Sequence, residues 1–304
     1  MEKVFLNHDT ALNSQGIYAV NLYTLGVPHT VVIDDYLPLT SQGNTLFAHP
    51  GKDNSLWVAI LEKAFAKYYG NYYHIEGGFP EIAVRTMNGG PHQEYDNKEI
   101  SEDKLWRTLL DHDVRKDIIT AGSPAGSDTE TDDKGIVQGH AYTLIGVKRL
   151  SNGARLVKLR NPWGKDSYHG DWGYDSGKWT PSLAKEAGEA QVKDDGVIWM
   201  SIQDYKKRFD WTTVNYNTDS MHRDHFLMLN DHTKEPGVWE GVCGRKCTLH
   251  KVIVESKVAQ KVWLTAHTWE DRNLPKKCKE DRNLKHSFGP NHEGSYWAFH
   301  GGAQ

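Results

Sequence analysis

The sequence predicts an α+β fold over residues 1–216, followed by an antiparallel β-sandwich domain. One observation is the helix-period spacing of apolar residues in 56–69. Another is a pair of β-rich segments, 141–149 and 155–160, on either side of an Asn-Gly turn signal. After about residue 217, apolar or alternating segments of strand length replace strong helical patterns. These changes divide the chain into predicted domains at 1–90, 91–216 and 217–304.

The first predicted domain opens with two strand-like segments, GIYAVNLYTL and HTVVIDDYLPL. A helix is expected over 56–69. Asn54 or Ser55 could cap its start, and Gly70 could end it. The segment 88–92, Asn-Gly-Gly-Pro-His, breaks all periodicity and is typical of a hinge or linker.

The second predicted domain contains helices near 100–112 and 181–190 and a strand, GVIWMSI. Between the first helix and the β-rich segments lies an acidic stretch, GSPAGSDTETDDKG. Its carboxylates have no fixed metal-ligand spacing, so we expect a solvated connection.

The two β-rich segments, AYTLIGVKR and RLVKLR, predict an antiparallel hairpin about Ser151-Asn152-Gly153. Antiparallel pairing brings His140 and Asn161 together at its open end, with a register uncertain by a few residues. An isolated histidine at a strand start is more often structural, so the chemistry rests on the combination.

A histidine held by an asparagine amide suits catalysis by a cysteine thiolate. The imidazolium keeps the thiol ionised, and the amide oxygen fixes the ring tautomer. Trp163 follows at once and could shield the His140–Asn161 hydrogen bond from water. The three cysteines of the chain, Cys243, Cys247 and Cys278, all lie far downstream.

The segments GIVQGHAYTL, KLRNPWG and DDGVIWMS, in that order, resemble the calpain family of papain-like cysteine proteases. VVIDDYLPL and NSLWVAILEKAFAKYYGNY also resemble the calpain core, so the match covers nearly the whole chain. The resemblance implies a two-lobed papain-like core with its first lobe incomplete, then a calpain-type β-sandwich, incomplete at its carboxyl end. It implies that His140 and Asn161 are catalytic and that Trp163 shields them. In that family the nucleophile lies upstream, on a helix that would precede Met1.

Calcium activates calpains in general, through oxygen ligands. Asp195 matches one acidic ligand position, but Val197 and Ser167 stand where the resemblance implies carboxylates. In the first lobe only Glu81 stands where the family segment is more acidic. We therefore expect no calcium site of the family's kind. A rearranged site from Asp166, Asp171 and Asp175 remains an alternative.

Zinc is a weaker possibility. Cys243, Cys247, His250 and Cys278 are suitable ligand types, but Cys278 is distant and His250 lies in strand-like alternation. We expect no bound metal or other cofactor.

Composition excludes several classes of function. With 36 basic and 40 acidic residues and a net charge of −4, there is no electrostatic case for nucleic acid. No apolar run reaches the length of a membrane span, and MEKVFLNHDT lacks the apolar core of a signal peptide. Three cysteines do not form a disulfide framework, so we expect a cytoplasmic protein.

The sequence thus predicts a calpain-like cysteine endopeptidase that acts on protein substrates but is inactive as written, since no thiol precedes His140. The alternative is a pseudoprotease or an interaction module that binds protein partners without cleaving them. A third reading is that a longer natural chain carries the nucleophile and is active.

Overall fold

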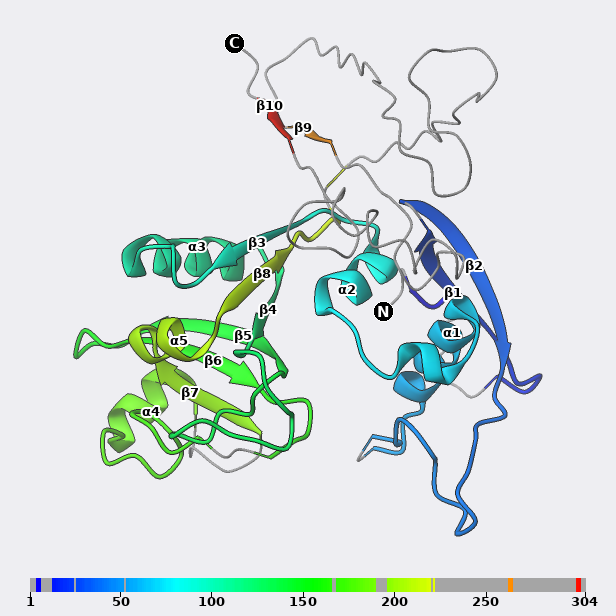
Figure 1. Cartoon of the computed structure of the whole chain (residues 1–304), viewed down its shortest axis with the longest axis horizontal. Helices are drawn as coiled ribbons and strands as arrows, with labels where there is room; N and C mark the ends of the chain where they lie inside the picture. The colour runs from blue at the N-terminus through cyan, green and yellow to red at the C-terminus, as the bar shows by residue number, and fades with distance from the viewer. Residues whose placement is uncertain are drawn as a thin grey trace. The chain divides into compact units, whose positions relative to one another are not determined.

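The computed structural model describes residues 4–6, 13–24, 26–51, 53–165, 168–189, 196–219 and 221, and the backbone of 262–264 and 299–301. The chain divides into two compact units, coloured along the sequence in Figure 1. The first consists of Met1–Gly78, Thr86–Pro91 and His222–Gln304, and the second of Phe79–Arg85 and His92–Met221.

The first unit contains an antiparallel hairpin of β1 (Ile17–Thr24) and β2 (Val27–Asp34). Helix α1 (Trp57–Tyr69) follows, then the short 3-10 helix η1 (Tyr72–Ile75). Apolar residues of α1 and of the hairpin form one buried cluster, made of Phe5, Val20, Leu22, Val31, Ile33, Ile60 and Ala64. The predicted helix over 56–69 is confirmed, whereas the second strand ends five residues earlier than HTVVIDDYLPL suggested.

The ends of α1 differ in how well the sequence predicted them. The expected cap by Asn54 or Ser55 is wrong, because Leu56 occupies the N-cap and makes no side-chain cap bond. A tight turn takes up the preceding residues, with the N–H of Gly51 donating to the carbonyl of Ser55 at 2.9 Å. Gly70 does end the helix, in a conformation of positive φ (103°) that glycine adopts at little cost.

The second unit is built on a six-stranded, fully antiparallel sheet in the order β3-β8-β4-β5-β6-β7. Its strands are β3 (His92–Asp96), β4 (Ile118–Gly122), β5 (Ala141–Arg149), β6 (Arg155–Arg160), β7 (Val197–Ser201) and β8 (Trp211–Asn215). Its helices are α3 (Glu102–Val114), α4 (Pro181–Ala187) and α5 (Ile202–Arg208). Helix α2 (Pro80–Asn88) runs across the boundary between the units.

Alternate residues of the central strands bury against different helices. Val157 and Met200 belong to the main core cluster, which also contains Leu105 of α3 and Tyr205 of α5. Their neighbours Leu156 and Trp199 belong to a second cluster, against which residues of α4 pack. Because successive side chains of a strand point to opposite faces, α3 and α5 cover one face of the sheet and α4 the other.

The β5–β6 hairpin contains a β-bulge. Leu144 pairs with Leu159, but Gly146 pairs with Lys158, so Ile145 has no partner in the ladder. The buried residues of β5 change phase at this point, from Tyr142 and Leu144 before the bulge to Val147 after it.

The tip of this hairpin is longer than a two-residue Asn-Gly turn. It spans Leu150–Ala154, closed by a bond of 2.8 Å from the Leu150 N–H to the Ala154 carbonyl. Gly153 takes the positive φ (87°) that the Asn-Gly signal anticipated.

Other predictions stand as follows. The helix near 100–112 is α3, and the helix near 181–190 is α4, which stops at Ala187 because Gly188 adopts φ 88°. The predicted mixture of helices with antiparallel strands is confirmed in the described residues.

Of the strands predicted after residue 217, TLHKVIVES lies outside the described residues. KVWLTAHTW includes β9 (Val262–Leu264), which pairs with β10 (Phe299–Gly301). The β-sandwich therefore stays a prediction. No helix in the described part of the chain combines the length and the apolar character needed to cross a membrane.

Candidate active site

His140 and Asn161 are joined by a hydrogen bond, with 3.1 Å between Nε2 of the ring and the Oδ1 of the amide. His140 directly precedes β5 and Asn161 directly follows β6, so both lie at the open end of the hairpin. An amide oxygen can only accept, so this bond places a proton on Nε2 and leaves Nδ1 as the site of exchange with another group. The predicted proximity of the two side chains is confirmed. Their catalytic role stays a prediction.

The bulge at Ile145 is what allows this pairing. Between the bulge and the open end of the hairpin, Thr143 pairs with Arg160. The same register continued places His140 opposite Trp163, and Asn161, two residues before Trp163, lies on the same face. If Ile145 were instead paired within the ladder, the register would shift by one residue, and His140 would fall opposite Gly164, on the face away from Asn161. The sequence indicated the hairpin but gave no sign of the bulge.

The Asn161 side chain is held from several directions. It is only 2 % exposed. Its Oδ1 also accepts a bond from the backbone N–H of Trp163 at 3.1 Å. The backbone N–H of Asn161 donates to the carbonyl of Gly196 at 2.8 Å, which fixes the peptide that carries this side chain. A buried amide with fixed partners is a rigid acceptor, which suits the orientation of an imidazole.

Two aromatic rings flank the His140 imidazole. The Trp163 ring lies 4.4 Å from it, tilted by 39°, and the Tyr142 ring meets it edge-on at 5.1 Å. Trp163 keeps 51 % of its surface exposed, so its indole covers the imidazole from the solvent side. This contact is the one that a shielding role for Trp163 requires.

Ser123, which follows β4, holds the backbone of His140 and was not recognised from the sequence. Its Oγ accepts from the His140 N–H at 2.9 Å and lies 3.0 Å from the His140 carbonyl oxygen. The Ser123 N–H donates to the same carbonyl at 3.0 Å. These bonds fix the peptide from which the imidazole projects.

The loop before His140 returns to the sheet at Gly139, whose φ is 56°. Its N–H donates to the carbonyl of Pro124 at 2.7 Å. The positive φ favours glycine, and the backbone of Gly126 leaves no room for a side chain.

The acidic part of this loop was predicted to be a solvated connection. That holds for 125–131, which are exposed, but it is wrong for Asp132, because its carboxylate is bound to a buried arginine, Arg208.

The described residues of the site provide an imidazole and an amide oxygen bonded to it. Cys243, Cys247 and Cys278 lie outside the described residues, as does His250, so the zinc alternative is untested. A His–Asn pair can take a proton from a thiol and return it to a leaving amine, but the bond-forming atom has to come from a thiol.

The positions considered for calcium are mostly outside the described residues, including Asp166, Ser167 and Asp195. Val197 is the first residue of β7 and is half-buried, and Glu81 lies in the first turn of α2.

The two described members of the rearranged alternative each have a basic partner. Asp171 lies 2.8 Å from the ammonium of Lys178, and Asp175 lies 2.9 Å from Nδ1 of His169. Over the described residues, no group of three or more His, Cys, Asp or Glu side chains could hold a metal ion.

Sequence similarity to known proteins covers the part of the chain that contains His140 and Asn161. A family model described as "Calpain family cysteine protease" matches residues 1–216. The chain is 38 % identical over 204 residues to "Calpain-type cysteine protease ADL1" of Oryza sativa subsp. japonica, covering 65 % of this chain and 9 % of that protein. It is 33 % identical over 239 residues to "Calpain-14" of Homo sapiens, covering 77 % and 34 %. It is 34 % identical over 237 residues to "Calpain-1 catalytic subunit" of Mus musculus, covering 74 % and 32 %. The match thus spans about a tenth of the plant relative and about a third of the animal relatives.

Proposed function

This chain belongs to the calpain family of cysteine proteases, and we propose that its His140–Asn161 pair serves the thiol-dependent cleavage of protein substrates. The observation that carries the proposal is the bond of 3.1 Å between His140 Nε2 and Asn161 Oδ1, in a segment that the family model covers. Within this proposal, 1–90 and 91–216 are the two lobes of a papain-like core, and 217–304 is a β-sandwich domain.

In the proposed mechanism a thiol transfers its proton to Nδ1 of His140, and the thiolate attacks the carbonyl carbon of a peptide bond. The imidazolium then returns the proton to the departing amine, leaving a thioester that water hydrolyses with the same imidazole as base. Asn161 keeps the ring in the tautomer that exposes Nδ1. The proposal also includes a reducing, cytoplasmic setting, which would keep the thiol reactive.

The thiol is the part of the reaction that the 304-residue polypeptide does not offer upstream of His140, because its cysteines are Cys243, Cys247 and Cys278. We therefore expect the polypeptide by itself to show no turnover. The same observation favours the second candidate function, a pseudoprotease that binds protein partners through the same surface without cleaving them.

The test has two arms. In the first, the polypeptide is incubated with casein and with a thiol-directed epoxide. No cleavage and no labelling that depends on His140 are expected. Epoxide-sensitive cleavage that His140→Ala abolishes would show that a downstream cysteine is the nucleophile.

In the second arm, a segment that carries the nucleophilic cysteine of a calpain-type protease is fused ahead of Met1. Casein cleavage that is lost in His140→Ala and in Asn161→Ala is the expected result. A folded fusion that binds casein without cleaving it would overturn the protease proposal in favour of the pseudoprotease.

A further inference from the structure

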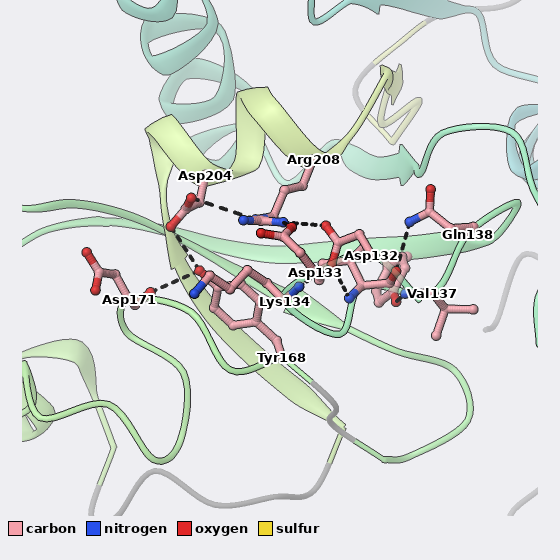
Figure 2. Close-up of polar contacts among 11 residues, drawn as sticks. Asp132, Asp133, Lys134, Val137, Gln138, Tyr168, Asp171, Asp204 and Arg208 are labelled. Atoms are coloured by element: carbon pink, nitrogen blue, oxygen red, sulfur yellow. Dashed lines mark hydrogen bonds and ion pairs between the residues drawn. The ribbon is translucent and has the colours of Figure 1, made fainter. Parts of the chain in front are cut away.

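The side chain of Arg208, the last residue of α5, lies inside the second unit with 5 % of its surface exposed. Its Nη1 contacts a carboxylate oxygen of Asp132 and lies 2.7 Å from Oδ1 of Asp133. Its Nε lies 3.7 Å from Oδ1 of Asp204, one turn earlier on the same helix. Figure 2 shows the guanidinium between the two loop aspartates and Asp204.

The contacts continue beyond the arginine. Tyr168 Oη, which is buried, donates to Oδ2 of Asp204 at 3.0 Å and lies 3.2 Å from the Asp171 carbonyl (Figure 2). Burial, with the nearby charge of Asp204, raises the pKa of Tyr168, so the phenol stays a donor at neutral pH. One buried guanidinium therefore joins the loop before His140 to α5 and to the segment after Trp163.

Hydrogen bonds within the loop order the residues that Arg208 contacts. Oδ1 of Asp132 accepts from the N–H groups of Lys134 at 2.8 Å and Ile136 at 2.9 Å. Thr131 and Val137 form an isolated antiparallel bridge. A displacement of the Asp132 carboxylate would therefore move the backbone of the 131–137 turn.

The turn is joined to His140 through short links. The N–H of Val137 donates to the Tyr142 hydroxyl at 3.1 Å, and the Tyr142 ring contacts the imidazole. Gly139, adjacent to His140, is fixed against the other end of the loop. Between the Arg208 anchor and the imidazole, the path consists of hydrogen bonds, the backbone of the turn and one ring contact.

The electrostatics make this anchor hard to replace. Burial alone would lower the pKa of Arg208, but its hydrogen bonds with Asp133 and Asp132 outweigh that effect and raise it. The hydrogen bond from Arg208 in turn lowers the pKa of Asp133. A buried cation that loses its partners keeps its desolvation cost, and a planar guanidinium can serve two carboxylates where an ammonium acts as a point charge.

We propose that Arg208 is a positioning residue for His140: by binding Asp132 and Asp133 it holds the 131–139 segment in the one placement that presents the imidazole to Asn161. The proposal rests on the proposed function only for the catalytic role of His140. The placement of the imidazole itself can be measured in a protein with no turnover.

The test uses the full chain with ¹⁵N-labelled histidine. The ring signals of His140 are assigned by their loss in His140→Gln. At about pH 8, where an ordinary histidine ring is neutral, the ¹⁵N shifts report which nitrogen carries the proton. The Asn161→Ala protein gives the signal of a ring without its amide partner.

Arg208→Gln is expected to move the His140 signals toward those of Asn161→Ala and to speed exchange of the Nε2 proton with water. Asp132→Asn should do the same to a smaller extent, and Arg208→Lys should recover part of the wild-type signal. The matched control is Arg155→Gln, because Arg155 also bridges two carboxylates, Glu102 and Asp103, in the same unit.

A folded Arg208→Gln protein with a lower melting temperature but the wild-type His140 signals would overturn the proposal. It would show that the contacts of Arg208 with Asp132 and Asp133 only stabilise the fold. An equal response to Arg155→Gln would overturn it as well. If Arg208→Gln does not fold, the His140 signals of Asp132→Asn and Asp133→Asn are compared in the same way, and unchanged signals in both would overturn the proposal. If the cysteine fusion does not cleave casein but Arg208→Gln moves the His140 signals, the protease function is rejected and the positioning role of Arg208 stands.

Discussion

Gly139 lies so close to Gly126 that a Cβ added at position 139 would stand 2.3 Å from the Gly126 carbonyl oxygen. Both glycines lie in the loop that leads into His140, and there the loop packs backbone against backbone. The residue next to the imidazole is thereby fixed by a contact that admits no side chain.

We expect Gly139→Ala to destabilise the second unit by about 2–4 kcal/mol, combining the cost of a side chain at positive φ with the clash. Gly153→Ala is the control, since its φ is 87° and a Cβ there would meet nothing within 4 Å. It should cost about 1–2 kcal/mol from conformation alone. Denaturant unfolding of the two variants measures the difference, and equal losses would contradict the close packing at Gly139.

Ser123→Ala should cost about 1–3 kcal/mol, because it leaves the His140 N–H without the Oγ that accepts its bond. Ser127→Ala, in the exposed part of the same loop, should stay within about 0.5 kcal/mol of wild type. Thermal melting gives both values. Faster amide hydrogen exchange at His140 in Ser123→Ala would locate the loss, and unchanged exchange there would argue against this hydrogen bond.

Stability should fall in alkaline solution, because burial raises the pKa of Tyr205 and of Tyr216. A group whose pKa is higher in the folded state stabilises the protein fully below its unfolded pKa, about 10 for tyrosine, and less as the pH rises above it. Tyr205→Phe should flatten this decline. It should also cost about 1 kcal/mol at pH 8, since the Tyr205 hydroxyl lies 2.7 Å from Oγ1 of Thr212.

The control is Tyr73→Phe, at a tyrosine that is 80 % exposed. Urea unfolding at pH 8 and near pH 10.5 compares the three proteins. An identical decline in wild type and Tyr205→Phe would show that this phenol does not drive the alkaline loss.

Calcium in the micromolar range should leave the melting temperature unchanged, because Ser167 and Val197 replace two carboxylates that the calpain resemblance implies. Sparse oxygen sites fall to millimolar affinity or weaker, and a ligand stabilises only in proportion to its concentration over Kd. Calorimetric titration and thermal melting measure this. A clear rise in melting temperature that Asp195→Asn removes would reveal a working site.

The hairpin and its His140–Asn161 pair could be predicted because both depend on neighbours along the chain. Two β-rich segments joined by a short polar turn pair with each other, and residues at their open ends meet. Helix α1 was predictable for a similar reason, since its apolar spacing is local.

Long-range contacts could not be predicted in this way. Ser123 binds the backbone of His140, which lies 17 positions away in the sequence. A serine at a strand end has no pattern that indicates such a bond. Arg208 contacts Asp132 from 76 positions away, so the local pattern of the acidic loop predicts only a solvated connection. Short strands β3, β4 and β8 carry weak patterns of their own, and pairing within the sheet determines them.

The unpaired residue at Ile145 also determines which changes of length this protein could tolerate during evolution or engineering. Inserting one residue between Ile145 and His140 would turn the imidazole to the side of the sheet opposite Asn161, whereas removing the bulged Ile145 would leave the pairs on both sides of it unchanged. Lengthening the tip at Leu150–Ala154 lies beyond the bulge and leaves that parity unchanged. Insertions are therefore compatible with the pair at the far end of the hairpin, and near His140 only in steps of two.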